Sequence, residues 1–122
     1  MTDTNRLKLL NDALDQFAVD RDWDQFHNPK NLCMALSGEV GELIEHFQWL
    51  TPEQSERLSD EKLAAVTAEM ADVYLYLIRL AQKLDVDLVD AAFKKIAVNA
   101  RKYPAERVRG SAKKYTEYDK PS

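Results

Sequence analysis

Two pairs of acidic residues have the spacing of one helical turn. Glu39 and Glu42 lie three residues apart, and so do Glu69 and Asp72, thirty residues further along the chain. On a helix, residues three apart point to the same side. Two antiparallel helices would therefore bring four carboxylates together, and these repel one another unless a cation lies among them. Hard divalent cations prefer oxygen ligands of this kind, so we expect a metal site here.

The acidic pairs belong to a longer internal repeat. Residues 35–44 and 65–74 carry small, apolar and acidic side chains at matching positions. The first copy contains Gly38 and Gly41 beside its two acids. Glycine inside a helix costs about 1 kcal/mol relative to alanine, so we expect a neighbouring group to approach closely there. The repeat predicts a local two-fold arrangement of two helices around a gap lined with carboxylates.

A solvated helix face is the alternative interpretation of each acidic pair, because glutamate is a common residue of exposed helices. Two observations favour the metal site. Both pairs border the apolar stripe of their helix, and no Lys or Arg lies three or four residues away to neutralise them. A site with oxygen donors, without cysteine and without a Glu-x-x-His pair, favours Mg²⁺ or Mn²⁺ over a di-iron centre. Bound Mg²⁺ commonly contacts phosphates, which implies a substrate that carries them.

Hydrophobic periodicity predicts the helices that position these acids. We expect four long helices: one at about 4–20, one at 29–49, one from 60 onwards, and one from 85 or 87 to 103. One or two short turns are expected to begin at 51–54. No stretch alternates as a strand would, so the predicted fold class is all-α, a four-helix bundle. The chain is expected to form a single domain, 1–122, with a helical core at about 4–103 and a basic, irregular tail at 104–122.

Each acid-bearing helix is expected to bury one apolar stripe. The stripes comprise Leu32, Leu36, Val40, Leu43 and Phe47 on one helix, and Leu63, Val66, Met70, Val73, Leu77 and Leu80 on the other.

The composition is that of a globular protein, with 45% hydrophobic and 31% charged residues. No apolar run approaches the roughly 20 residues that a membrane span needs, so no membrane partner is expected. The first eight residues lack an apolar signal segment, and the single Cys33 excludes an internal disulfide. We therefore expect a cytoplasmic protein.

Charge is distributed unevenly around the net value of −4. Residues 94–115 hold eight basic residues and one acidic residue, which leaves nine basic and twenty acidic residues elsewhere. A basic segment beside an acidic body either binds a polyanion or is a solvated tail, and the charge pattern leaves both interpretations open.

The ordered motifs resemble those of a known family. Glu39-x-x-Glu42, 26 intervening residues and Glu69-x-x-Asp72 are similar to the metal-binding signature of the all-α nucleoside triphosphate pyrophosphohydrolases, the MazG-like superfamily. Within this superfamily, the chain most resembles the dCTP pyrophosphatase branch. The stretches that carry this resemblance are 21–27, 31–32, 38–43, 47–49, 109–112 and 114–116. The resemblance covers about residues 14–118.

This resemblance implies an enzyme that hydrolyses a (deoxy)nucleoside triphosphate to the monophosphate and pyrophosphate. The substrate that it implies most strongly is dCTP or a modified dCTP. It implies that Glu39, Glu42, Glu69 and Asp72 hold Mg²⁺ or Mn²⁺, with Glu39 or Glu42 as the catalytic base. It also implies a homo-oligomer, a dimer or tetramer, with no nucleic-acid partner. The substrate-binding residues that it implies are Trp23, Asp24, Gln25, Phe26, His27, Trp49, Tyr76, Lys95, Asn99, Lys102 and Tyr103.

Each of these substrate contacts has an ordinary alternative. Trp23 and Phe26 can cap the core, Tyr76 can be a core residue, and the lysines can be solvated. One position departs from the family pattern, since animal-type members carry a histidine nine residues before the matching tryptophan and this chain has Leu14. The base preference is therefore open. The alternative to an enzyme is a non-catalytic helical module that binds a protein or nucleic acid through its acidic and basic patches.

Overall fold

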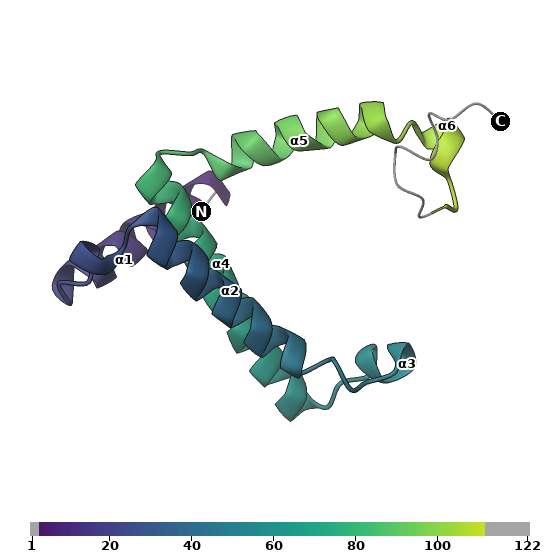
Figure 1. The fold of residues 1–122 in the computed structure, drawn as a ribbon, viewed down its shortest axis with the longest axis horizontal. Coiled ribbons are helices and arrows are strands. Elements are labelled where there is room, and N and C mark those ends of the chain that lie inside the picture. The colour runs from purple at the N-terminus through teal and green to yellow at the C-terminus, as the bar shows by residue number, and fades with distance from the viewer. Residues whose placement is uncertain (1–2, 112–122) are drawn as a thin grey trace. The chain divides into compact units, whose positions relative to one another are not determined.

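A computed structural model describes residues 3–111, with side chains from residue 5, and this part of the chain contains helices and no strands (Figure 1). The predicted all-α fold class is therefore confirmed. None of the described helices is long and apolar enough to cross a bilayer. The elements are α1 (Asp3–Asp20), the 3-10 turn η1 (Asp24–Phe26), α2 (Pro29–Glu45), α3 (Pro52–Ser55), α4 (Asp60–Leu84), α5 (Leu88–Lys102) and α6 (Ala105–Val108).

Polar caps begin the helices close to where the sequence predicts them. The Asn28 side chain accepts a hydrogen bond from the backbone N–H of Asn31 at 2.9 Å, just before the proline that opens α2. Thr51 and Gln54 form a reciprocal capping box at α3, where a short turn was predicted. Of the two aspartates considered for the start of α5, Asp87 is the one that caps it, through the N–H of Asp90.

Two predicted boundaries are wrong. α2 ends at Glu45 and not near Trp49, because His46 and Phe47 donate their N–H groups three residues back and tighten the chain into turns. Residues 105–108 form the short helix α6, although the segment after 103 was expected to be irregular. Residues 112–122 of the predicted tail lie outside the described residues.

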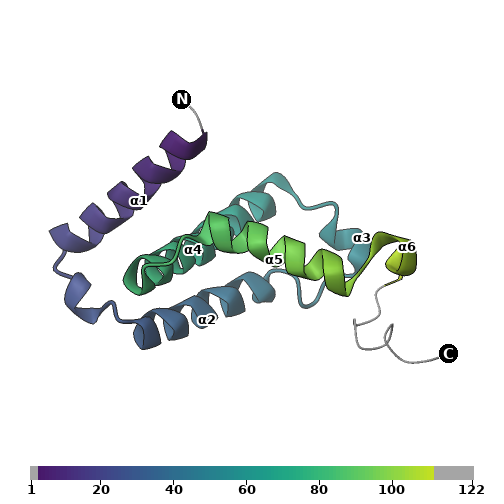
Figure 2. The same ribbon diagram turned by 90° about the horizontal axis from the view of Figure 1, so that it is seen from above.

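The chain divides into two compact units, one up to Val86 and one from Asp87 onwards. In the first unit α2 and α4 run side by side, and α1 packs against α4 (Figure 2). The second unit contains α5 and α6. A single domain with one four-helix bundle stays a prediction.

The seam between α2 and α4 differs from the predicted apolar stripes. Leu32 and Val66 are buried as expected, but the half-buried side chains along the seam include Glu39 and Glu69. The predicted core residues Val40, Leu63, Met70 and Leu77 are exposed, Met70 by 56%. The apolar surface of each helix is wider than one neighbouring helix can cover. The acids therefore lie inside the seam, and an apolar strip beside them has no cover from the described residues of the first unit.

Leu32 tests how much the seam contributes to stability, because it is the largest fully buried side chain, 1% exposed. Leu32→Ala should lower the free energy of unfolding by about 2–4 kcal/mol, since it removes buried methyl groups and leaves a cavity. Met34→Ala, on the exposed side of the same helix, should change it by less than about 0.5 kcal/mol. Urea denaturation followed by circular dichroism measures both. Equal losses would contradict the burial described here.

Candidate metal centre

The two acidic pairs lie on facing helices and meet at one place. One carboxylate oxygen each of Glu39 on α2 and of Glu69 and Asp72 on α4 lies within 4.8 Å of the other two. Glu42 is outside this set of three but is close enough to influence the pKa of both glutamates through a side-chain hydrogen bond. We call these four residues the carboxylate cluster. Their meeting follows from the antiparallel pairing of the two repeat copies.

Two oxygens of the carboxylate cluster are buried without a partner. The Oε2 atoms of Glu39 and Glu69 are shielded from solvent and accept no hydrogen bond from the described residues. A buried polar atom left unpaired costs on the order of 1–3 kcal/mol, and more if it is charged. Such an atom is rare in a native fold unless it binds a water, an ion or another ligand. The cluster thus has the chemistry of an incomplete coordination shell of oxygen donors, which suits a hard divalent cation.

Electrostatics within the carboxylate cluster disfavour full ionisation. The pKa of Glu39 is raised to about 7, first by burial, then by the hydrogen bond and the charge of Glu42, with Asp72 and Glu69 contributing. The pKa of Glu69 is raised by burial first and by Glu42 next, and the charge of His46 opposes the rise. Without a cation, a proton on Glu39 lowers the repulsion among the carboxylates. A divalent cation would lower this repulsion further.

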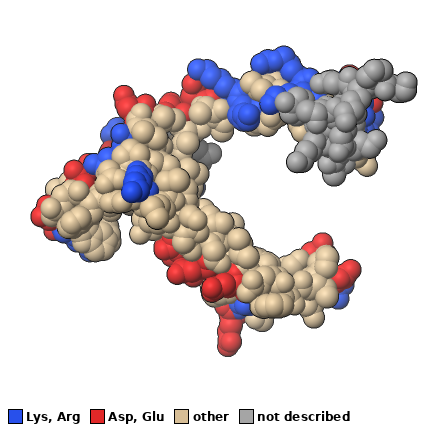
Figure 3. Space-filling view, in the orientation of Figure 1, with Lys and Arg blue, Asp and Glu red and all other residues tan. Residues whose placement is uncertain are grey.

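No basic side chain of the same helices neutralises these acids. In the described part of the chain, none of the lysines and arginines of α1, α2 and α4 forms an ion pair with the carboxylate cluster. Figure 3 shows acidic side chains gathered over the α2–α4 pair. A Cβ built on Gly38 or Gly41 would meet no atom within 4 Å. The glycines therefore leave open space beside the acids, and no contact within the described residues accounts for their cost in helix stability.

The aromatic segment, residues 23–27, lies beside the C-terminal part of α4, where hydrogen bonds and ion pairs of Arg79 and Lys83 hold it. Asp24 accepts hydrogen bonds from Arg79 Nη2 at 2.6 Å and from Lys83, and its pKa is lowered, most of all by the hydrogen bond from Lys83. His27 Nδ1 accepts from Arg79 Nε at 3.0 Å. Trp23 packs edge-to-face on Phe17, with ring centroids 5.7 Å apart.

The remaining residues predicted to bind substrate have different surroundings. Tyr76 is half-buried on α4, two turns after Glu69, and Gln25 donates a local hydrogen bond to Asp22. Phe26 and Trp49 are exposed, Trp49 by 85%. Trp49 follows the end of α2, whereas the aromatic segment precedes its start. Four predicted contacts lie on α5 or at its end, in the second unit: Lys95, Asn99, Lys102 and Tyr103.

Sequence reasoning missed Arg79, the buried charged residue of α4. Its signal is a lone arginine within the apolar run 75–81. An arginine is rarely buried unless acceptors surround it, so that position should have indicated partners elsewhere in the chain. Those partners come from α1 and the aromatic segment, more than 50 residues away in sequence, and no local pattern identifies them.

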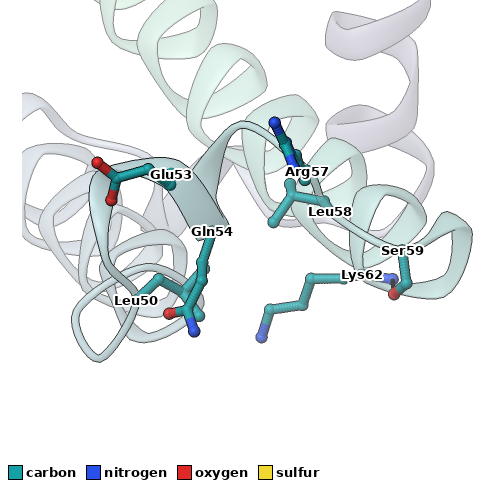
Figure 4. Close-up of a pocket in the computed structure, with 7 residues that line it drawn as sticks. All are labelled: Leu50, Glu53, Gln54, Arg57, Leu58, Ser59 and Lys62. Carbon is teal, nitrogen blue, oxygen red and sulfur yellow. Dashed lines mark hydrogen bonds between the residues drawn. The ribbon is translucent and has the colours of Figure 1, made fainter.

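A pocket of about 530 Å³ lies between the end of α2 and the start of α4 (Figure 4). It contains none of the predicted site residues. Its lining comprises Leu50, Glu53, Gln54, Arg57, Leu58, Ser59 and Lys62.

Comparison with known proteins gives consistent matches. A model of the MazG-like family matches residues 34–118. Human dCTP pyrophosphatase 1 is 48% identical over 104 residues, 84% of this chain and 61% of the human protein, and the bovine protein is 47% identical over 62% of its length. The chain thus spans about three-fifths of these relatives. A crystal structure of a pyrophosphatase from Archaeoglobus fulgidus has a TM-score of 0.78 and 35% identity, covering 81% of this chain and 93% of that one.

The raised pKa of Glu39 makes stability depend on pH. Unfolded glutamate titrates near pH 4.3, whereas Glu39 in the fold titrates at about 7. Between these values the folded state binds a proton that the unfolded state lacks, so this contribution stabilises the fold at pH 6 and is lost by pH 8. The thermal unfolding midpoint in EDTA should therefore fall between pH 6 and pH 8.

Glu39→Gln provides the matched control, because it removes the titrating group and keeps the shape. The midpoint of this variant should depend less on pH over the same interval, and the comparison cancels the contribution of the histidines. An equal dependence in both proteins would show that Glu39 is not the group responsible.

Proposed function

Because the chain belongs to the MazG-like family, we propose that it hydrolyses (deoxy)nucleoside triphosphates to the monophosphate and pyrophosphate, with dCTP or a modified dCTP as the preferred substrate. The observation that carries this proposal is the carboxylate cluster, in which two buried oxygens lack a partner. The human and bovine relatives named dCTP pyrophosphatase 1 support the reaction class and the base. We place the activity in the cytoplasm, where the single cysteine stays reduced.

We propose Mg²⁺, or Mn²⁺ in its place, as the cation held by Glu39, Glu42, Glu69 and Asp72. An all-oxygen donor set fits these ions, and the unpartnered Oε2 atoms of the two glutamates fit the role of ligands. When bound, such an ion polarises phosphate oxygens and lowers the pKa of bound water.

The glutamates of α2 have different surroundings, which suits different roles. The Oε2 atom of Glu39 is shielded from water, whereas Glu42 is exposed and close to both buried glutamates. We propose that Glu39 serves mainly as a ligand and that Glu42 accepts the proton of the attacking water. A base that is open to solvent can pass on the proton it accepts, and Glu42 is the exposed residue of this pair.

The nucleotide pocket is proposed to form between two copies of the chain. α2 has 17 residues, and at 1.5 Å per residue it separates the aromatic segment from Trp49 by about 26 Å. One copy therefore cannot close both aromatic groups around one base. The exposed apolar strip along α2 and α4, which includes Val40, Met70 and Leu77, supports a homo-oligomer that covers it.

The reaction is tested by incubating the protein with Mg²⁺ and a panel of triphosphates and identifying products by ³¹P NMR. We expect pyrophosphate and the monophosphate, fastest with dCTP or a modified dCTP. Glu42→Gln should lower kcat on the order of 10²-fold or more, because it removes the proposed base without changing side-chain size. Its helical circular dichroism should match that of the wild type.

Glu45→Gln is the matched control for that variant, since it lies one turn further along α2 and outside the carboxylate cluster. Its turnover should stay within about twofold of the wild type. Full activity of Glu42→Gln would remove the role assigned to that residue. Absence of turnover on every nucleotide would instead favour a non-catalytic helical binding module.

A shared pocket is tested by mixing two variants that each bind dCTP more weakly than the wild type. Trp23→Ala and Trp49→Ala should each raise the KM for dCTP, because each removes a stacking surface for the base. If each site takes one tryptophan from each copy, subunit exchange between the variants restores some wild-type sites. Assay of the mixture after exchange should then show more activity than either variant alone. A mixture no better than the average of the two would overturn the shared pocket.

A further inference from the structure

We propose that Arg79 is a positioning residue for the nucleotide pocket, which fixes the aromatic segment and holds His27 in the neutral tautomer with its proton on Nε2. This inference rests on the proposed function for the part that concerns substrate, and on the geometry of the described residues for the part that concerns the histidine. Arg79 lies outside the carboxylate cluster, and its effect on catalysis would act through His27 and Asp24.

All three guanidinium nitrogens of Arg79 are engaged. The residue is 2% exposed, so an unpaired donor there would carry a large desolvation cost. Nε donates to His27 Nδ1 at 3.0 Å, Nη1 to Asp15 Oδ1 at 2.8 Å and to Gln82 Oε1 at 2.9 Å, and Nη2 to Asp24 Oδ1 at 2.6 Å. The planar fork of arginine matches this set, and a lysine ammonium does not.

These contacts tie the aromatic segment to the rest of the first unit. Within the described residues, the long-range side-chain hydrogen bonds that reach residues 23–27 come from Arg79 and Lys83. Asp15 joins the same guanidinium to α1. The carboxylate of Asp24, predicted to contact substrate, is thus engaged in holding the segment. Trp23 and Phe26 are about half exposed, and their placement depends on the anchors on either side of them.

The hydrogen bond from Arg79 also decides the chemistry that His27 presents. A guanidinium only donates, so Nδ1 of the ring must offer a lone pair and the ring proton must be on Nε2. Burial lowers the pKa of His27, the charges of Arg79 and Lys83 lower it further, and Asp24 opposes them. His27 is therefore a neutral donor at pH 7. A neutral donor in the pocket suits an acceptor group of the nucleotide, such as a base carbonyl.

The two halves of the proposal are tested in one set of variants. The chain has two histidines, so ¹⁵N-labelled histidine gives two resolved ring systems by NMR. In the wild type, His27 should show a protonated Nε2 and an unprotonated Nδ1 at pH 7. Arg79→Met should yield a mixture of tautomers, and should raise the KM for dCTP on the order of tenfold, equivalent to about 1.4 kcal/mol, with kcat within about twofold.

Asp15→Asn is the matched control. It removes the ion pair of Arg79 with Asp15, whose carboxylate is somewhat more exposed than that of Asp24, but it leaves the aromatic segment untouched. Its His27 tautomer and its KM should stay close to those of the wild type. If Arg79→Met does not fold, Asp24→Asn weakens the hold of Arg79 on the segment by removing the carboxylate charge, and it should also raise the KM.

A protonated Nδ1 on His27 in the wild type would overturn the tautomer assignment, whatever the activity. An unchanged KM in both Arg79→Met and Asp24→Asn would overturn the positioning role. A wild-type protein that turns over no nucleotide would overturn the proposed function, and the histidine spectra would then still decide whether Arg79 sets the tautomer.

Discussion

The repulsion among carboxylates in a helix seam is the interaction on which the rest of this structure depends. Packing α2 against α4 places Glu39 and Glu69 where apolar side chains would be more stable, and it leaves an oxygen of each without a partner. Leu32 of α2 and Val66 of α4 are buried, and their apolar burial offsets part of this cost. A cation bound among these carboxylates, as proposed, would offset their repulsion and pair the unpartnered oxygens. Stability and function are then set by the same four side chains.

The sequence predicted the helices and the acids well because both depend on local rules. Asn28, Thr51 and Asp87 cap their helices through hydrogen bonds within three residues, and these are readable from the residue types. The antiparallel meeting of the two acidic pairs followed from the repeat. The roles of individual residues in catalysis remain predictions, since they depend on the metal ion and the substrate as well as on the chain.

The sequence did not predict which of several similar helix surfaces would be buried. Helix α4 carries apolar residues over more than one face, and periodicity does not say which face a single neighbour covers, so Met70 and Leu77 were wrongly expected to be buried. Arg79 was missed because its partners are distant in sequence. The end of α2 was misplaced because its last turns tighten without a proline or glycine to mark the change.

The repeated acidic motif also bears on how an unsymmetrical substrate is oriented. The two copies contribute unequally to the cluster, because one oxygen of α2 and two of α4 lie within 4.8 Å of one another, so a cation bound there as proposed would meet different surroundings on its two sides. Beyond the repeat the two copies differ further, because His46 follows the end of α2 whereas the corresponding Tyr76 lies within α4. On the proposed function, substitutions at these flanking positions would change nucleoside selectivity and leave the carboxylate cluster unchanged.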